Sequence, residues 1–164
     1  MSASIAFVFP GQGSQSLGML AEHGANYPLV MHSFAEASEA LGYDLWALIQ
    51  QGPEALLNQT DKTQPAILAA SIALWSLWQV KGGAMPAYLA GHSLGEYSAL
   101  VAAGSLSFAD ALRLVELRGQ LMQDAAPAGV GAMAAVLGAE DELVADVCVQ
   151  ASGSQVVVPA NYNS

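Results

Sequence analysis

A serine inside a Gly-x-Ser-x-Gly pentapeptide is the residue of this chain whose surroundings most directly indicate chemistry. The pentapeptide (GHSLG, residues 91–95) lies between a strand-like run, Ala87–Ala90, and a helix-like run, Glu96–Ala103. A serine on such a turn holds its hydroxyl clear of the sheet, and the backbone N–H of the next residue, Leu94, faces an oxyanion formed there. The flanking glycines leave room where the backbone is tightly crossed. We therefore predict that Ser93 is a nucleophile.

A second candidate is the glycine-rich loop at residues 11–15 (GQGSQ), which follows an apolar run. A dinucleotide fingerprint would need a glycine at position 16, where this chain has Ser16, and an acidic residue about 20 residues further on, which is missing. The sequence therefore excludes a dinucleotide site of that type. Two interpretations stay open: a simple glycine-rich turn, or an oxyanion-hole loop that donates a backbone N–H toward Ser93.

Arg118 is the third candidate, because it falls where a helix should be apolar. Helical residues step about 100° around the axis, which places Arg118 in the middle of an apolar stripe, whereas Arg113 points to the polar side. The stripe consists of Ala111, Leu114, Val115, Leu121 and Met122. An unpaired buried guanidinium is very costly, so Arg118 must meet a carboxylate, backbone carbonyls or a bound anion. A structural ion pair or snorkelling side chain and a site for a substrate carboxylate are both open.

The three histidines, His23, His32 and His92, all precede Ser93. The α/β-hydrolase triad runs in the order Ser, then Asp or Glu, then His, so this chain cannot complete that triad by itself. His92 sits directly before the serine, where neighbouring side chains diverge, and we interpret it as a packing or hydrogen-bonding residue rather than a base. No Cys, His and Asp cluster has metal-ligand spacing, so neither a metal nor a cofactor is expected.

The elements that must position these residues alternate between strand-like and helix-like patterns. The predicted strands are Ile5–Phe9 and Ala87–Ala90. Helical patterns are predicted in six places: up to about Leu41, around Asp44–Gln50, at Pro53–Leu57, from Pro65 to the stop at Gly82-Gly83, from Glu96 to Ala103, and from about Ser107 to Ala125. Thr63 is a possible cap of the helix that opens at Pro65. Strands separated by helices predict an α/β fold with a parallel sheet covered on both faces.

The sequence changes in character after residues 127–129 (PAG). It predicts a strand at Gly131–Leu137, a helix at Glu140–Gln150 and a strand at Val156–Pro159, which together form a compact β-α-β unit. We therefore expect residues 1–128 to form one domain and residues 129–164 to begin another. A last strand that leads directly to a terminus has little to pack on, so we expect the sequence to be cut off.

The composition excludes several classes of function. The net charge is −10 with only four cations, Lys62, Lys81, Arg113 and Arg118, and nucleic-acid binding needs clustered Lys and Arg. The longest apolar stretch, Ala66–Trp78, is too short and too interrupted to span a bilayer, so we expect no membrane association and read it as a largely buried helix. The N-terminus has no signal-peptide pattern, and the single Cys148 suits a cytoplasmic protein.

Four ordered motifs resemble the malonyl-CoA:acyl carrier protein transacylases. They are residues 9–15 (FPGQGSQ), 63–66 (TQPA), 91–96 (GHSLGE) and Arg118-Gly119, and the resemblance extends over essentially the whole chain. The chain is similar to the bacterial enzymes of type II fatty acid synthesis and, more broadly, to polyketide synthase acyltransferase domains. The resemblance implies a large α/β-hydrolase-like domain with an inserted ferredoxin-like domain, of which residues 129–164 would be the first half.

The resemblance also implies site residues and partners. Ser93 would accept the acyl group, the backbone N–H groups of Gln12 and Leu94 would form the oxyanion hole, and Arg118 would pair with the malonyl carboxylate. The further site-lining residues would be Gln64, His92 and Asn163. The implied partners are malonyl-CoA and acyl carrier protein, and the full-length protein would be a monomer. The family's general-base histidine lies in a C-terminal portion that this sequence lacks, so we expect this chain alone to be inactive.

Two alternatives remain beside the transacylase hypothesis. A serine esterase or thioesterase with an α/β-hydrolase-like fold would explain the turn at Ser93, but it gives no reason for Arg118. A non-catalytic fragment would explain the missing base.

Overall fold

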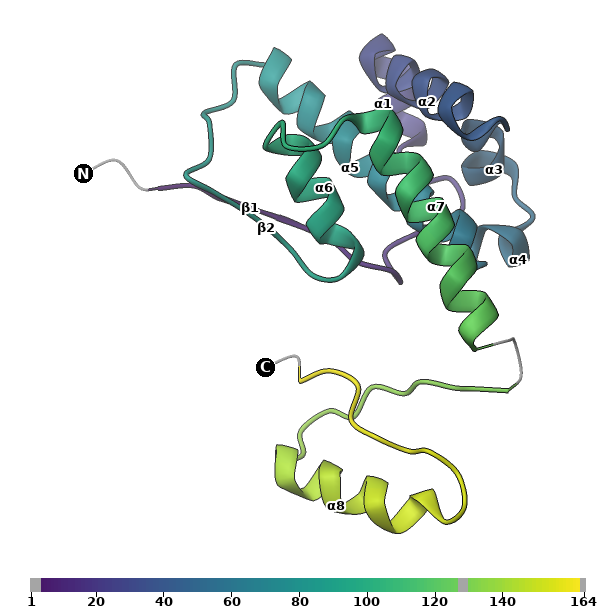
Figure 1. Cartoon of the computed structure of the whole chain (residues 1–164). Coiled ribbons are helices and arrows are strands. Elements are labelled where there is room, and N and C mark those ends of the chain that lie inside the picture. The colour runs from purple at the N-terminus through teal and green to yellow at the C-terminus, as the bar shows by residue number, and fades with distance from the viewer. Residues whose placement is uncertain (1–3, 127–129, 163–164) are drawn as a thin grey trace. The chain divides into compact units, whose positions relative to one another are not determined.

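The computed structural model describes residues 4–126 and 130–162. The chain divides into two compact units, residues 1–128 and residues 129–164, which we describe separately (Figure 1). The described elements of the first unit are β1 (Ala6–Phe9), α1 (Ala21–Asn26), α2 (Pro28–Leu41), α3 (Leu45–Gln51), α4 (Glu54–Leu57), α5 (Thr60–Val80), β2 (Tyr88–Gly91), α6 (Leu94–Ala102) and α7 (Phe108–Ala125). The second unit contains α8 (Asp141–Ser152).

The two described strands form a parallel pair, in which Ala6 lies opposite Tyr88 and Phe9 opposite Gly91. Both predicted strands are thus confirmed to within one residue. The carboxyl ends of parallel strands meet at one edge of a sheet, so the loop after β1 and the turn after β2 leave the sheet side by side. The expected cover on both faces is wrong for the described residues, because Val8 and Tyr88 are 75% and 70% exposed.

Helix α5 is the centre of the core of the first unit, as Figure 1 shows by its place among α2, α6 and α7. Twelve of its residues are buried, so the prediction of a helix buried on most sides is confirmed. Helix α2 adds Val30, Phe34 and Ala37 to this core, and the Phe34 ring packs edge-on against Trp46 with 4.9 Å between centroids. This packing fixes α5 as a rigid support for the polar residues near its N-terminal end.

The predicted start of α5 at Pro65 is wrong, because the helix begins at Thr60 and Pro65 lies inside it. Thr63 is therefore not a cap. Its hydroxyl is buried and donates a hydrogen bond to the Leu57 carbonyl at 2.5 Å. The rule that places proline in the first turn rests on its missing N–H, and it takes no account of tertiary contacts of the residues before it. Here Asp61 and Lys62 contact α7, as described below, and these contacts support the additional first turn.

The other helix boundaries agree with the sequence patterns. The C-terminal end of α5 is followed by Gly82, whose φ of 75° is in the left-handed region that favours glycine. Helix α7 begins after Ser107, whose hydroxyl oxygen accepts a hydrogen bond from the Asp110 N–H at 3.2 Å and so caps the helix. This cap fixes where α7 starts, and with it the position of Arg118 along the helix.

The second unit departs from the predicted β-α-β pattern. Its helix α8 confirms the prediction for Glu140–Gln150, but neither Gly131–Leu137 nor Val156–Pro159 is a strand in the described residues, apart from an isolated bridge at Gly131. Leu137 and Val156 are 90% and 88% exposed. A strand is held by the hydrogen-bonded ladder to its neighbour, and no such ladder exists among residues 130–162.

The length and hydropathy of the helices bear on the expectation that the chain does not span a membrane. None of those in residues 4–126 and 130–162 is both long enough and apolar enough to cross a bilayer.

Candidate active site

Ser93 occupies the sharp turn between β2 and α6 that the pentapeptide predicts. Its φ of 54° and ψ of −111° are strained for a residue that carries a side chain, and its side chain is exposed. The turn is closed by hydrogen bonds from the Gly95 N–H to the His92 carbonyl at 2.9 Å and from the Glu96 N–H to the Ser93 carbonyl at 3.2 Å. The strain at Ser93 is the cost of presenting a hydroxyl at the sheet edge.

The two glycines of the pentapeptide allow backbones to meet at this turn. A Cβ on Gly91 would overlap the backbone of Gly95, and a Cβ on Gly95 would overlap the Phe9 carbonyl at the end of β1. Both neighbours are backbone atoms that no rotamer change can move, so both positions require glycine. The first turn of α6 therefore lies directly on the end of β1.

Arg118 reaches this turn from α7 and connects it to α5. Its Nη2 donates a hydrogen bond to the Ser93 hydroxyl at 3.0 Å, and its Nη1 donates one to Gln64 Oε1 at 2.8 Å. The guanidinium carbon also lies 5.7 Å from the centroid of the Tyr97 ring. Three helices thus fix the position of one half-buried cation.

Gln64 has no exposed surface, and its side chain has a partner at each end. Besides accepting from Arg118, it donates through Nε2 to the Met122 sulfur at 3.3 Å. A buried amide with both ends hydrogen-bonded has a fixed orientation, so its carbonyl oxygen stays directed at the guanidinium. The structure therefore brings Gln64 next to Arg118; its role as a site-lining residue stays a prediction.

The apolar stripe predicted for α7 is wrong in its orientation. The buried residues of α7 are Ala111, Leu112, Val115 and Gly119, whereas Leu114, Leu121 and Met122 of the predicted stripe are exposed. The buried face is turned by less than one residue's step of about 100°. Arg118 consequently lies at the border between the buried and the exposed face, and not in the middle of an apolar one. This border position lets a half-buried arginine reach Ser93.

The ion pairs of the described residues do not include Arg118. They join Lys62 to Asp61 and Glu116, and Arg113 to Asp110 at 3.2 Å on the exposed side of α7. The interpretation of Arg118 as half of a structural ion pair is therefore not realised in residues 4–126 and 130–162. Its charge meets an amide oxygen, a hydroxyl oxygen and an aromatic ring, and these neutral groups do not neutralise it.

The glycine-rich loop after β1 lies against the turn after β2. A Cβ placed on Gly11 would come within 3.2 Å of the His92 carbonyl oxygen and 3.8 Å of its Nδ1, so the two loops are in contact. The Gln12 side chain holds this loop to the start of α5 by donating to the Thr60 hydroxyl at 3.3 Å. The backbone N–H groups of Gln12 and Leu94 donate to no acceptor in residues 4–126.

The remaining predicted site residues are placed less fully. The His92 side chain is exposed and lies beside Gly11, and its packing or hydrogen-bonding role stays a prediction. Asn163 lies outside the described residues. Within the described residues, no three side chains of His, Cys, Asp or Glu are grouped in a way that could hold a metal ion.

The sequence reasoning missed a second polar cluster where α5 crosses α7. Lys62 Nζ lies 2.8 Å from Glu116 and 3.2 Å from Asp61, and 4.3 Å from the centroid of the Tyr43 ring. Burial lowers the pKa of Lys62, but hydrogen bonds and charges from Glu116 and Asp61 outweigh it and raise that pKa above its usual value. Burial, with the charges of Glu116 and Asp61, also raises the pKa of Tyr43. The only sign of this cluster in the sequence is that Lys62 is one of just four cations.

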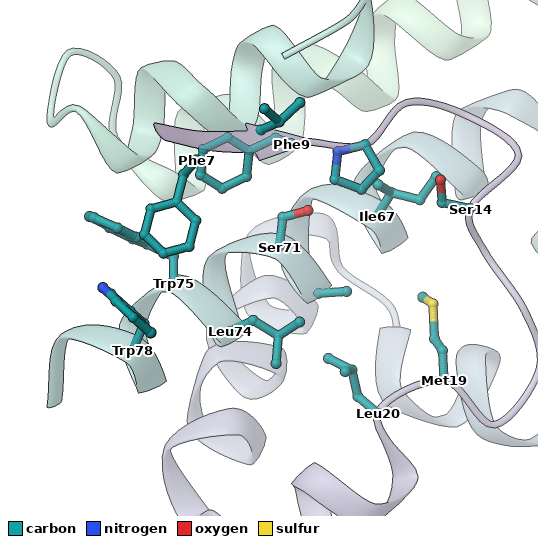
Figure 2. A pocket seen from close by; sticks show the side chains of 13 residues that line it. Phe7, Phe9, Ser14, Met19, Leu20, Ile67, Ser71, Leu74, Trp75 and Trp78 are labelled. Atoms are coloured by element: carbon teal, nitrogen blue, oxygen red, sulfur yellow. The ribbon is translucent and has the colours of Figure 1, made fainter. Parts of the chain in front are cut away.

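The first unit also has an apolar pocket of about 470 Å³, whose lining includes none of Ser93, Arg118 and Lys62. Figure 2 shows that Phe7 from β1 and Trp75 and Trp78 from α5 form one end of it, with Met19 and Leu20 at the other. The Phe7 ring packs edge-on against both tryptophans, with centroid distances of 5.4 and 5.2 Å. None of the described residues that line this pocket is charged, so it offers no group that could pair with a carboxylate.

The comparisons with known proteins agree on one family. The model of the acyl transferase domain family matches residues 6–164. The malonyl CoA-acyl carrier protein transacylase of Salmonella typhimurium is 64% identical over 159 residues, which are 97% of this chain and 52% of the relative. The crystal structure of a malonyl-CoA:acyl carrier protein transacylase from Xanthomonas oryzae is 67% identical, with a TM-score of 0.94 over 100% of this chain and 52% of that one.

A third comparison includes a partner protein. A malonyl-transacylase solved in complex with its type II PKS acyl-carrier protein is 58% identical, with a TM-score of 0.94 over 99% of this chain and 52% of that one. This chain thus spans about half the length of the relatives that it matches. From the extent of the family match and these identities, the chain belongs to the acyl transferase domain family.

Proposed function

We propose that this protein transfers a malonyl group from malonyl-CoA to the phosphopantetheine thiol of acyl carrier protein, as a step of fatty acid biosynthesis. The names of the relatives support the reaction, and the carrier-protein complex of one of them supports the partner. The observation that carries the proposal is Arg118, whose Nη2 lies 3.0 Å from the Ser93 hydroxyl and which has no carboxylate partner among the described residues.

The reaction would run through an ester on Ser93. The Ser93 oxygen attacks the thioester carbonyl of malonyl-CoA, the carbon–sulfur bond breaks, and coenzyme A leaves as its thiol after taking up a proton. The carrier thiol then attacks the ester carbonyl, which forms a new thioester and returns the Ser93 hydroxyl. The N–H groups of Gln12 and Leu94, which donate to no acceptor in residues 4–126, would stabilise the oxyanion of each step.

Arg118 would select the acyl group. In a malonyl group a single methylene separates the carboxylate from the reacting carbonyl, so a cation in contact with the Ser93 oxygen is close enough to pair with it. An acetyl group has no carboxylate, and it would leave the guanidinium without a counter-charge. The same Nη2 that now contacts Ser93 would turn to the ligand, while Gln64 keeps its hold on Nη1.

The base that activates Ser93 would come from outside the described residues. The partner of the Ser93 hydroxyl within them is Arg118, and a guanidinium does not accept a proton at physiological pH. No histidine follows Ser93 in the sequence, and His92 lies beside Gly11. We therefore propose that the 164-residue chain by itself does not turn over. The cytoplasmic location and the monomeric state remain predictions, the first from the single cysteine and the second from the family resemblance.

Intact-mass analysis tests the proposal on the purified product of the complete gene. Incubation with malonyl-CoA should give a protein that carries one malonyl group, and addition of acyl carrier protein with its phosphopantetheine arm should move that group to the carrier. Release of free malonate at the same rate with and without carrier would contradict the proposal and favour the esterase or thioesterase alternative. The 164-residue chain is the matched control, and a malonyl adduct formed on it at the same rate would contradict the missing-base argument.

A further inference from the structure

Gly119 of α7 lies directly against the backbone of the first turn of α5. A Cβ at this position would lie 2.5 Å from the Asp61 Cα, 2.7 Å from the Asp61 nitrogen and 2.7 Å from the Thr60 carbonyl oxygen. All three are backbone atoms of the first turn of α5, so no side-chain rotation can relieve the overlap. Any side chain at position 119 must push the two helices apart.

Polar contacts hold the same two helices together on both sides of Gly119. One turn before it, Glu116 accepts a hydrogen bond from Lys62 at 2.8 Å. One turn after it, Gln123 donates a hydrogen bond to Asp61 at 3.1 Å. These contacts and the bare backbone at Gly119 fix how far apart the two helices are and how they are aligned along their axes.

The site residues are the immediate neighbours of this contact. Arg118 directly precedes Gly119, and Gln64 follows the first turn of α5 by one residue. Their hydrogen bond of 2.8 Å, and the 3.0 Å contact from Arg118 to Ser93, therefore depend on the spacing of the two helices. The motif Arg118-Gly119 thus joins a ligand-facing cation to the residue that determines its position.

We propose that Gly119 is a positioning residue that, together with the Lys62–Glu116 pair, holds Arg118 against Ser93 and thereby sets the preference for acyl groups that carry a carboxylate. This inference rests on the proposed function, because it concerns the same serine and the same reaction. It assigns Gly119 no contact with the substrate. Gly119 acts only through the position of the guanidinium.

The substitution Gly119→Ala separates this role from a general effect on the helix. Alanine favours a helix more than glycine does, so a purely local effect would stabilise α7. The overlap with the Asp61 backbone should instead displace α7 by about 1 Å, and a misplacement of that size at a reacting group costs about 100-fold in rate. We expect kcat/KM for malonyl transfer to fall by about 100-fold, and that for acetyl transfer to change little.

A double-mutant cycle on the purified product of the complete gene is the decisive experiment. The malonyl/acetyl ratio of kcat/KM is measured for the wild type, Gly119→Ala, Arg118→Ala and the double variant. We expect Gly119→Ala to lower the ratio in the wild-type background and to leave it unchanged when Arg118 is already alanine. The matched control is Gln120→Ala, an exposed position on the same helix, which should leave the ratio at its wild-type value. An equal loss for both acyl groups, or the same loss in both backgrounds, would overturn the proposal.

A second variant and a second readout keep the test decisive. If Gly119→Ala does not fold, Lys62→Met, which retains most of the length of the side chain but not its charge, should lower the ratio in the same direction and to a smaller extent. If the wild type transfers neither acyl group, the proposed function fails, and malonate binding is then followed through the NMR signals of the Arg118 guanidinium. Weaker malonate binding in Gly119→Ala than in Gln120→Ala would still support the positioning role, and equal binding would overturn it.

Discussion

Two half-buried cations belong to the two helices that meet at the site, Lys62 to α5 and Arg118 to α7, and their surroundings differ. Lys62 is within 2.8 Å of Glu116 and 3.2 Å of Asp61, with the Tyr43 ring 4.3 Å away. Arg118 has an amide, a hydroxyl and the Tyr97 ring as neighbours, and no ion pair in the described chain includes it. Both cations carry a charge that burial disfavours, but within residues 4–126 and 130–162 only Lys62 has carboxylates that neutralise it.

This difference separates a structural cation from one that is available to a ligand. A partly buried charge is tolerated when opposite charges and hydrogen bonds surround it, as they do Lys62. At Arg118 the neutral oxygens orient the guanidinium without neutralising it, so an incoming carboxylate gains a charge-assisted contact at no cost to an existing ion pair.

The largest effect is expected at the atom that Arg118 contacts. Ser93→Ala removes the hydroxyl that would form the ester, and kcat for malonyl transfer should fall on the order of 10⁶-fold. Intact-mass analysis should show no malonyl adduct, while the circular dichroism spectrum stays that of the wild type. Retention of an adduct at wild-type rate would move the nucleophile to another residue.

The next largest effect is expected for Arg118, which pairs with no carboxylate in the part of the chain that the structure describes. Arg118→Ala should lower kcat/KM for malonyl transfer about 10²-fold, or about 3 kcal/mol, and raise acetyl transfer relative to malonyl transfer. The control is Arg113→Ala on the same helix, because Arg113 is exposed and paired with Asp110. Steady-state kinetics with both acyl donors measure the ratio. An unchanged ratio in Arg118→Ala would remove the distinction between the two cations.

Lys62 should affect stability more than selectivity. In Lys62→Met the carboxylates of Asp61 and Glu116 lose their shared cation, and the free energy of unfolding should fall by about 2 kcal/mol. Urea unfolding measures this change. The malonyl/acetyl ratio should fall less than in Arg118→Ala, because Lys62 acts on the site only through the spacing of α5 and α7. A selectivity loss as large as that of Arg118→Ala would mean that both cations face the substrate.

The smallest effect is a change of stability at alkaline pH. The pKa of Lys62 is raised by Glu116 and Asp61 in the folded protein, so its contribution is fully present below the unfolded pKa of about 10.4 and is lost as the pH rises through the higher folded value. The difference in unfolding free energy between the wild type and Lys62→Met should be constant from about pH 7 to pH 9 and shrink above about pH 10.4. A difference that shrinks below pH 9 instead would contradict the assigned cause.

The parts of the fold that sequence patterns predicted are those with strong local signals. The sequence predicts the turn at Ser93, both strands, the start of α7 near Ser107 and helix α8 to within a few residues, because glycines and apolar periodicity act on neighbouring residues in the chain. In the same way, the unusual position of Arg118 could be recognised from the sequence, although the stripe around it was misplaced.

The errors arose where distant residues decide the structure. Helix α5 starts before Pro65 because Asp61 and Lys62 contact α7, and those partners lie more than fifty residues away. The two strands predicted in the second unit are missing from its described residues because a strand depends on a neighbouring ladder as well as on its own β-branched residues. The contact of Gly119 with the Asp61 backbone could not be predicted at all, since a glycine gives no sign of what lies against it.

The structure of the malonyl-Ser93 intermediate tests the central claim most directly, that the charge of Arg118 is kept for the acyl carboxylate. Crystals of the complete gene product soaked briefly with malonyl-CoA in the absence of carrier protein should trap it. We predict that the carboxylate lies within hydrogen-bond distance of the Arg118 guanidinium, that Gln64 still holds Nη1, and that the contact from Nη2 to Ser93 is replaced. A malonyl carboxylate bound elsewhere, with Arg118 paired to a carboxylate of the protein, would contradict the account.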